Sequence, residues 1–170
     1  MHKYTLSITC NGQTRKLVFT RASQESEEHL ALKLLAYLLH FELEPKVEFA
    51  VGQHFKPDLV CLTGRDVSLW VDCGDIGYHK LDKVATRNHR AQVIVVKATA
   101  RSAAAYQRQA VRRIRRPERV AYAGFDDGFV AGVVQSLSTR TVLTATTSQD
   151  RTRLELTIND CLMETRVHWS

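Results

Sequence analysis

Two aspartates and a lysine are the side chains whose positions in this sequence point most directly to chemistry. Asp58 stands just before a short apolar run, Asp72 closes a second one, and Lys83 follows in a basic segment. If the two runs are neighbouring antiparallel strands, both aspartates lie at the same end of the sheet and can converge. Paired carboxylates suit a hard divalent cation. Either aspartate alone is more simply explained as a turn cap, so the hypothesis of a metal site depends on the pair.

The segments that carry these residues have the pattern of a hairpin followed by a helix. Residues 59–62 and 67–71 are apolar, and turn-forming residues separate them. A helix over 79–90 is predicted next. If this helix begins beside Asp72, the long side chain of Lys83 can reach back over the strand ends.

An acidic, leucine-rich segment precedes the hairpin. A serine cap, three glutamates at the start (Glu25, Glu27 and Glu28) and leucines at helical spacing predict a largely buried helix. Glutamates in a first helical turn usually complement the helix dipole, which is the simpler explanation here. Pro45 ends this helical region, and the alternation over 47–51 predicts a strand.

The remaining segments predict further strands and helices. A hairpin turns at Asn11-Gly12, and the continuous apolar run at 92–96 predicts a central parallel strand buried on both faces. Towards the C-terminus the pattern predicts a helix over 102–116, a strand over 119–123, a short helix after Asp126-Asp127, and a closing hairpin of strands over 141–146 and 154–158. Together these elements predict a single α/β domain over residues 1–170.

The composition is typical of a globular protein. The chain has 170 residues, of which 44% are hydrophobic and 25% charged, and this suits one domain with a substantial core. No run approaches about 18 apolar residues and no apolar signal core follows Met1, so we expect a cytoplasmic protein that does not contact a membrane. The four scattered cysteines lack zinc-like spacing. A P-loop, a dinucleotide glycine motif and a nucleophile elbow are absent as well.

Positive charge is concentrated in one part of the chain. Residues 79–119 contain 12 Lys or Arg against two acidic residues, whereas the whole chain has a net charge of +6. A single basic stripe is usually a solvated helix face, but this excess favours a polyanion as partner. The candidate nucleic-acid-binding residues are Lys80, Arg87, Arg90, Arg108, Arg112 and Arg115.

These motifs together resemble a known family. Pro57-Asp58, a gap of strand length, Asp72-Cys73-Gly74 and a downstream lysine are similar to the PD-(D/E)XK nuclease superfamily, and specifically to its YaeQ family. The resemblance extends over nearly the whole chain. It implies a PD-(D/E)XK nuclease-like core, a mixed central sheet flanked by helices, with additional N- and C-terminal β-hairpins. The usual lysine position, two after the acidic residue, is Gly74 here, and the matching lysine is Lys83.

The resemblance also implies roles for individual residues. Asp58, Asp72 and the main-chain carbonyl of Cys73 would bind Mg²⁺ or Mn²⁺. Glu28 would face the acidic site and hold a metal-bound water or act from the second coordination shell, with Glu27 as the adjacent alternative. Lys83 would be the catalytic lysine.

Two classes of function follow from these assignments. The first is a Mg²⁺-dependent endonuclease that acts on DNA. The alternative is a catalytically inactive protein of the same fold, which binds nucleic acid without cutting it or contacts a transcription or repair partner as a regulator.

Overall fold

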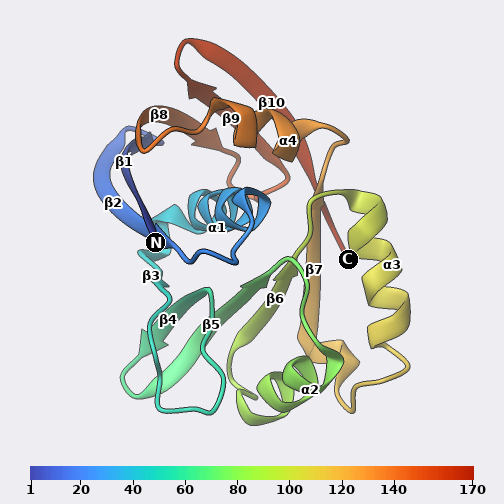
Figure 1. Ribbon diagram of the computed structural model, residues 1–170. Helices are drawn as coiled ribbons and strands as arrows, with labels where there is room; N and C mark the ends of the chain where they lie inside the picture. The colour runs from blue at the N-terminus through green and yellow to red at the C-terminus, as the bar shows by residue number, and fades with distance from the viewer.

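The computed structural model describes residues 1–170 as one mixed α/β fold with a ten-stranded sheet and four α-helices (Figure 1). The strands are β1 (His2–Cys10), β2 (Gln13–Arg21), β3 (Lys46–Val47), β4 (Leu59–Thr63), β5 (Asp66–Cys73), β6 (Gln92–Val96), β7 (Val120–Phe125), β8 (Arg140–Thr147), β9 (Arg153–Ile158) and β10 (Cys161–Trp169). The helices are α1 (Glu27–Leu39), α2 (Tyr78–Arg87), α3 (Ala100–Ala110) and α4 (Phe129–Ser136). The strand order is β2-β1-β8-β9-β10-β7-β6-β5-β4-β3. No helix in this structure combines the length and the apolar character needed to cross a membrane.

One end of the sheet is formed by the two termini of the chain. The predicted N-terminal hairpin is confirmed: β1 and β2 are antiparallel, and both Asn11 and Gly12 have positive φ, as a tight hairpin turn requires. β1 pairs in parallel with β8, so the N-terminal hairpin and the C-terminal strands form one continuous sheet. The predicted closing hairpin is part of a larger unit, because β10 follows β9 through a turn at Asn159-Asp160.

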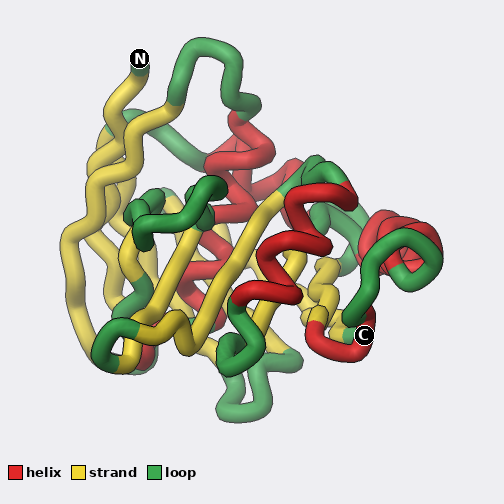
Figure 2. The backbone as a smooth tube through the Cα atoms, turned by 90° about the horizontal axis from the view of Figure 1, so that it is seen from below, coloured by secondary structure: helices red, strands yellow, loops and turns green.

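Helix α1 lies at the centre of the molecule. Ser26 caps it by accepting a hydrogen bond from the backbone N–H of His29, and every residue from Leu30 to Leu39 is buried. A helix that is apolar on all sides needs cover on all sides. The sheet supplies it by curving past α1, which contacts β2, β4, β5 and β8 as well as α4. Figure 2 gives the view from below, in which a central helix in red lies between strands in yellow.

Helices α2 and α3 cover the opposite face of the sheet. Along β5 and β6 the side chains alternate: Val71 and Ile94 face the α1 side, whereas Trp70 and Val95 pack in the cluster under α2 and α3. β6 is parallel to both β5 and β7 and is buried on both faces, as its apolar run predicts. The end of β5 is therefore enclosed by helices on two sides.

Three predicted boundaries were wrong. The strand predicted over 47–51 stops at Val47, because Glu48 adopts a positive φ of 49° and residues 48–58 form a loop. Helix α2 ends at Arg87, where Asn88 turns its side chain onto the Val84 carbonyl. Helix α3 ends at Ala110 instead of residue 116, because the following N–H groups tighten onto nearer carbonyls before the chain turns towards Asp82.

Candidate functional site

The ends of β4 and β5 bring the two predicted metal-binding aspartates side by side. The strands are antiparallel, with Leu59 opposite Val71, and the Asp58 N–H donates to the Val71 carbonyl at 3.0 Å. Asp58 and Asp72 therefore occupy facing positions at one end of the hairpin. The antiparallel pairing of these strands is as the sequence predicts.

The two carboxylates nevertheless have different partners. Asp58 Oδ2 accepts a hydrogen bond from the Cys73 N–H at 2.7 Å and lies 3.1 Å from Nε2 of His29, on α1. Asp72 Oδ1 accepts from Lys80 Nζ at 2.8 Å, and its Oδ2 accepts from Trp70 Nε1 at 2.9 Å. Asp58 is thus neutralised from the α1 side and Asp72 from the α2 side.

The surroundings shift the pKa values of the two aspartates in opposite directions. Burial raises the pKa of Asp72, which is 1% exposed, and the opposing effect of Lys80 does not cancel it. Burial also acts to raise the pKa of Asp58, but the contact with His29 and the Cys73 N–H outweigh it, so this pKa is lowered. The contact with Asp58 in turn raises the pKa of His29 against the effect of burial. Of the two neighbouring aspartates, Asp58 therefore ionises more readily than an ordinary aspartate and Asp72 less readily.

The ammonium group beside Asp72 belongs to Lys80. Lys80 lies in the first turn of α2, next to the end of β5, and also donates to the Lys56 carbonyl at 3.3 Å. Lys83, one turn further along, is exposed and forms no ion pair; it lines a separate pocket on the outer side of α2. The sequence assigned Lys83 to the strand ends and Lys80 to nucleic-acid binding, but the lysine beside Asp72 in the structure is Lys80. Lys80 lies in the turn of α2 that directly follows the end of β5, and Lys83 lies one turn further from Asp72.

A cleft opens beside the strand ends. It has a volume of about 250 Å³, and Glu28, His29, Gly74 and Asp75 are among its lining residues. Glu28 lines this cleft whereas Glu27 does not, which favours Glu28 of the two alternatives. Lys97 contacts two of these lining residues: its Nζ donates to the Gly74 carbonyl at 2.5 Å and lies 3.6 Å from Asp75. The cleft thus has acidic walls with a lysine beside them.

A buried ionic network that the sequence reasoning missed supports the α1 side of the site. Lys33 is fully buried, with its Nζ 2.5 Å from Glu25 and 3.0 Å from Glu48. Burial acts to lower the pKa of Lys33, but the two carboxylates more than offset it and the pKa is raised. A lysine in the middle of a leucine-rich helix is a signal that could have revealed this network, because a buried charge needs partners.

The donor set suits a hard cation in kind. No group of three or more His, Cys, Asp or Glu side chains converges in the structure. Mg²⁺ in proteins is commonly held by one or two carboxylates, with water and substrate phosphate completing the shell. Asp58, Asp72 and the Cys73 carbonyl would hold such an ion. Its positive charge would then replace part of the charge that Lys80 and His29 now supply to the two carboxylates.

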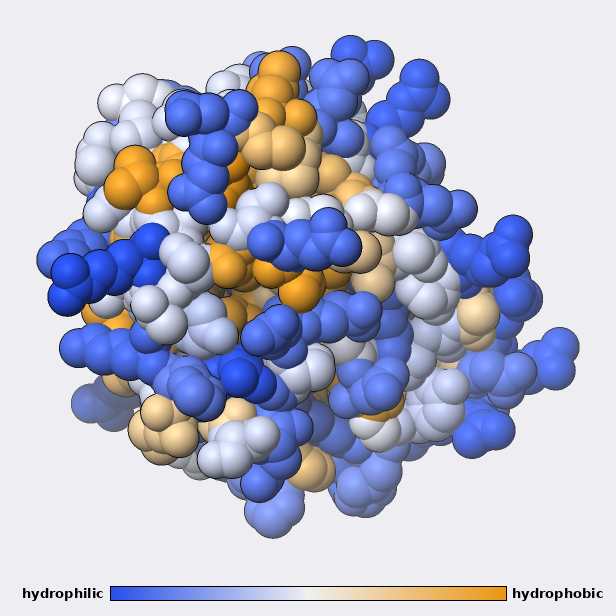
Figure 3. Space-filling view, turned by 45° about the horizontal axis from the view of Figure 1, so that its top comes forward, coloured by the Kyte–Doolittle hydropathy of each residue, from blue (hydrophilic) through white to orange (hydrophobic).

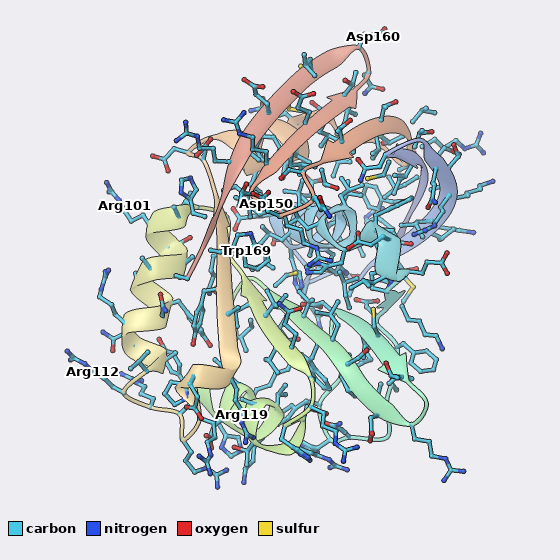
Figure 4. All side chains as sticks on the ribbon, turned by 180° about the vertical axis from the view of Figure 1, so that it is seen from behind. Arg101, Arg112, Arg119, Asp150, Asp160 and Trp169 are labelled. Atoms are coloured by element: carbon cyan, nitrogen blue, oxygen red, sulfur yellow. The ribbon has the colours of Figure 1, made fainter.

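The candidate nucleic-acid-binding residues are spread over α2, α3 and the segment after α3. Arg87, Arg108 and Arg112 are exposed and form no ion pair, whereas Arg90 pairs with Asp66 at 3.0 Å and Arg115 with Asp82 at 3.1 Å. Figure 4 places Arg101 at one end of α3, with Arg112 and Arg119 towards the other end. The face drawn in Figure 3, in contrast, mixes hydrophilic side chains with smaller apolar areas.

Comparison with known proteins gives one consistent result. A family model described as "YaeQ protein" matches residues 11–165. The structure of the YaeQ protein from Xanthomonas axonopodis pv. citri is similar, with a TM-score of 0.80 and 12% identity over 98% of this chain and 96% of that one. The YaeQ protein from Pseudomonas syringae gives a TM-score of 0.73 and 15% identity over 99% and 93%. At such identities the likeness of these structures shows the fold. No curated protein matches.

Proposed function

The chain belongs to the YaeQ family, and from its strand-end carboxylates we propose that it is a metal-dependent, nuclease-like protein that hydrolyses phosphodiester bonds in DNA. The observation that carries this proposal is the facing pair Asp58 and Asp72, with the Lys80 ammonium 2.8 Å from Asp72. Two carboxylates and an amine beside an open cleft are the groups that hydrolysis of a phosphodiester requires.

The order of elements supports a PD-(D/E)XK-like core. From α1 the chain passes through β3, β4 and β5, crosses by α2, and enters β6 parallel to β5. This succession of one helix, three strands, a helix and a strand is what that superfamily's core requires. It also places α1 and α2 on opposite sides of the two aspartates.

The residues of the chain divide the work at the site. Lys80 holds Asp72 in place and keeps a positive charge where negative charge develops on the phosphate. His29 and the Cys73 N–H orient Asp58. Glu28, on the cleft wall, can accept a hydrogen bond from the attacking water. A bound Mg²⁺ or Mn²⁺ would polarise the phosphodiester and lower the pKa of water.

A second function is supported by the charge balance of the same site. Both aspartates already have protein partners, and the usual lysine position is Gly74, whose φ of +77° is unfavourable for a lysine. A protein that binds nucleic acid, or a transcription or repair partner, without cleavage would need no more than this. Its contacts with DNA would come from exposed arginines such as Arg108 and Arg112.

The test is metal-dependent nicking of supercoiled plasmid. The wild type should nick with Mg²⁺ or Mn²⁺ and not in EDTA, and Asp72→Asn should lower the rate by about 100-fold or more. Asp66→Asn is the matched control, because Asp66 is an exposed aspartate at the other end of β5. Absence of nicking with either metal would favour the non-cleaving function, whereas equal rates in the two variants would contradict the role proposed for Asp72.

A further inference from the structure

A second pocket lies on the outer side of α2. It has a volume of about 390 Å³, is formed between the loop around residues 53–55 and α2, and shares no lining residue with the strand-end cleft. It contains Lys83, the lysine that the structure leaves without a place at the strand ends. Its walls are therefore separate from the groups that the proposed hydrolysis uses.

The pocket has an aromatic wall. The ring of Phe55 lies 4.7 Å from that of His54 and 6.4 Å from that of His79, centroid to centroid, and both imidazoles stand edge-on to it. Phe55 is half-buried against the core under α2, and Val84 adds an apolar surface beside it. Aromatic side chains at a surface pocket are platforms on which nucleobases stack.

Cationic groups stand on the rim of the same pocket. Lys83 and Arg87 are exposed and form no ion pair, and they follow one another at helical spacing along α2. Arg115 joins them from the segment after α3. The backbone N–H of Arg115 donates to Asp82 at 2.8 Å, and its Nε donates to the same carboxylate at 3.1 Å. The two terminal nitrogens of the guanidinium have no acidic partner. Two unpaired cations and a guanidinium with free N–H donors, all beside an aromatic ring, suit a phosphate attached to a base.

One further feature indicates a preformed binding site. The side-chain amides of Gln53 and Asn88 exchange hydrogen bonds at 2.6 and 3.1 Å, which ties the loop that carries Phe55 to the end of α2. Both walls of the pocket are therefore held together without a ligand.

We propose that this pocket binds a nucleotide, with the base against Phe55 and the phosphate on Lys83, Arg87 and Arg115. The nucleotide is either free or one unit of a nucleic-acid strand, since both present the same base and phosphate. A bare anion would not need the aromatic wall, and a purely apolar ligand would not need the three cations. The proposal does not depend on cleavage or on a bound metal.

The test measures binding of two probes in EDTA, so that the strand-end site makes no contribution. Adenosine monophosphate is titrated by calorimetry, and a short fluorescein-labelled oligo(dA) by fluorescence anisotropy. Phe55→Ala should weaken binding by about 5- to 150-fold, the range for loss of one base–aromatic stack. Because Phe55 packs partly against the core, Phe55→Leu, which keeps an apolar side chain, is measured beside it. Arg87→Glu should weaken binding by at least about fivefold.

Arg101→Glu is the matched control, because Arg101 is an exposed arginine on α3 that does not line the pocket. If the Phe55 and Arg87 variants, but not the control, lose binding of the monophosphate, a free nucleotide is a ligand. If the same variants lose binding of the oligonucleotide only, the ligand is a nucleic-acid strand. The proposal is overturned if neither probe binds, if both Phe55 variants bind as the wild type does, or if Arg101→Glu weakens binding as much as Arg87→Glu.

Discussion

Two lysines one turn apart on α2 have different surroundings. Lys80 faces the end of β5, where its ammonium contacts a carboxylate whose side chain is 2% exposed. Lys83, one turn later, is exposed and touches no acid. The first lysine compensates a buried charge, whereas the second has no acidic partner in the structure. A single helical turn thus separates a paired lysine from an unpaired one.

The comparison extends to the regions around the two lysines. At the strand ends every buried charge has a partner: Lys80 with Asp72, His29 with Asp58, and Lys33 with two glutamates. On the outer side of α2 and α3 most cations have none. We propose a small hard cation as the ligand of the first region and an extended anion as the ligand of the second. The two proposals therefore concern sites of opposite charge balance on one helix.

The largest expected effect is on stability and separates the two lysines. Lys80→Met keeps the apolar stem but leaves Asp72 buried without its cation. The free energy of unfolding should fall by about 3 kcal/mol. This is the low end of the range for a broken buried ion pair, because Lys80 is partly exposed. Lys83→Met should change it by less than about 0.5 kcal/mol. Urea denaturation measures both. Similar losses of unfolding free energy in the two variants would contradict the contrast between Lys80 and Lys83.

Much of the fold could be predicted from local pattern. The turn at Asn11-Gly12, the leucine-rich α1 and the apolar run of β6 each carry a signal that depends on few neighbours. The hairpin of β4 and β5 was equally accessible. β10 was missed because Asn159-Asp160 is a less obvious turn than a glycine-containing one, although both residues adopt positive φ here. Long-range pairing, such as β1 with β8, has no local signal at all.

The positions of the two aspartates were predicted, but their contacts were not. Sequence spacing brought Asp58 and Asp72 to one end of a sheet, and the structure places them there. The partner of Asp72 could not be assigned from spacing, because Lys80 and Lys83 are neighbours on one helix face and both have side chains long enough to reach back. The turn of Asp58 towards His29 depends on how α1 packs against the sheet, which no spacing along the chain describes.

A smaller effect concerns pH and contrasts the two aspartates. The lowered pKa of Asp58 means that its stabilising contribution is present above the ordinary aspartate value of about 4 and is lost as pH falls through the lowered pKa. Asp58→Asn should therefore be most destabilising near neutrality and less so in acid. The raised pKa of Asp72 has the opposite effect. The stability that Asp72 contributes is present below the ordinary aspartate value and is lost as pH rises through the raised pKa.

Asp72→Asn should accordingly become less destabilising as pH rises above about 4. Urea denaturation of the wild type and both variants between about pH 3 and pH 7 gives the two difference curves. Slopes of opposite sign support the account of the strand ends. Slopes of the same sign would show that one environment surrounds both carboxylates.

The most direct test of the central claim, that the ends of β4 and β5 bind a divalent cation, is calorimetric titration of the protein with Mn²⁺. We expect a single class of site in the wild type, accompanied by a rise in thermal stability through linkage. Asp58→Asn and Asp72→Asn should each abolish both signals, whereas Asp66→Asn should retain them. No heat and no thermal shift at millimolar-scale Mn²⁺, or unchanged binding in Asp72→Asn, would contradict the claim and leave the two aspartates as members of a purely structural ionic network.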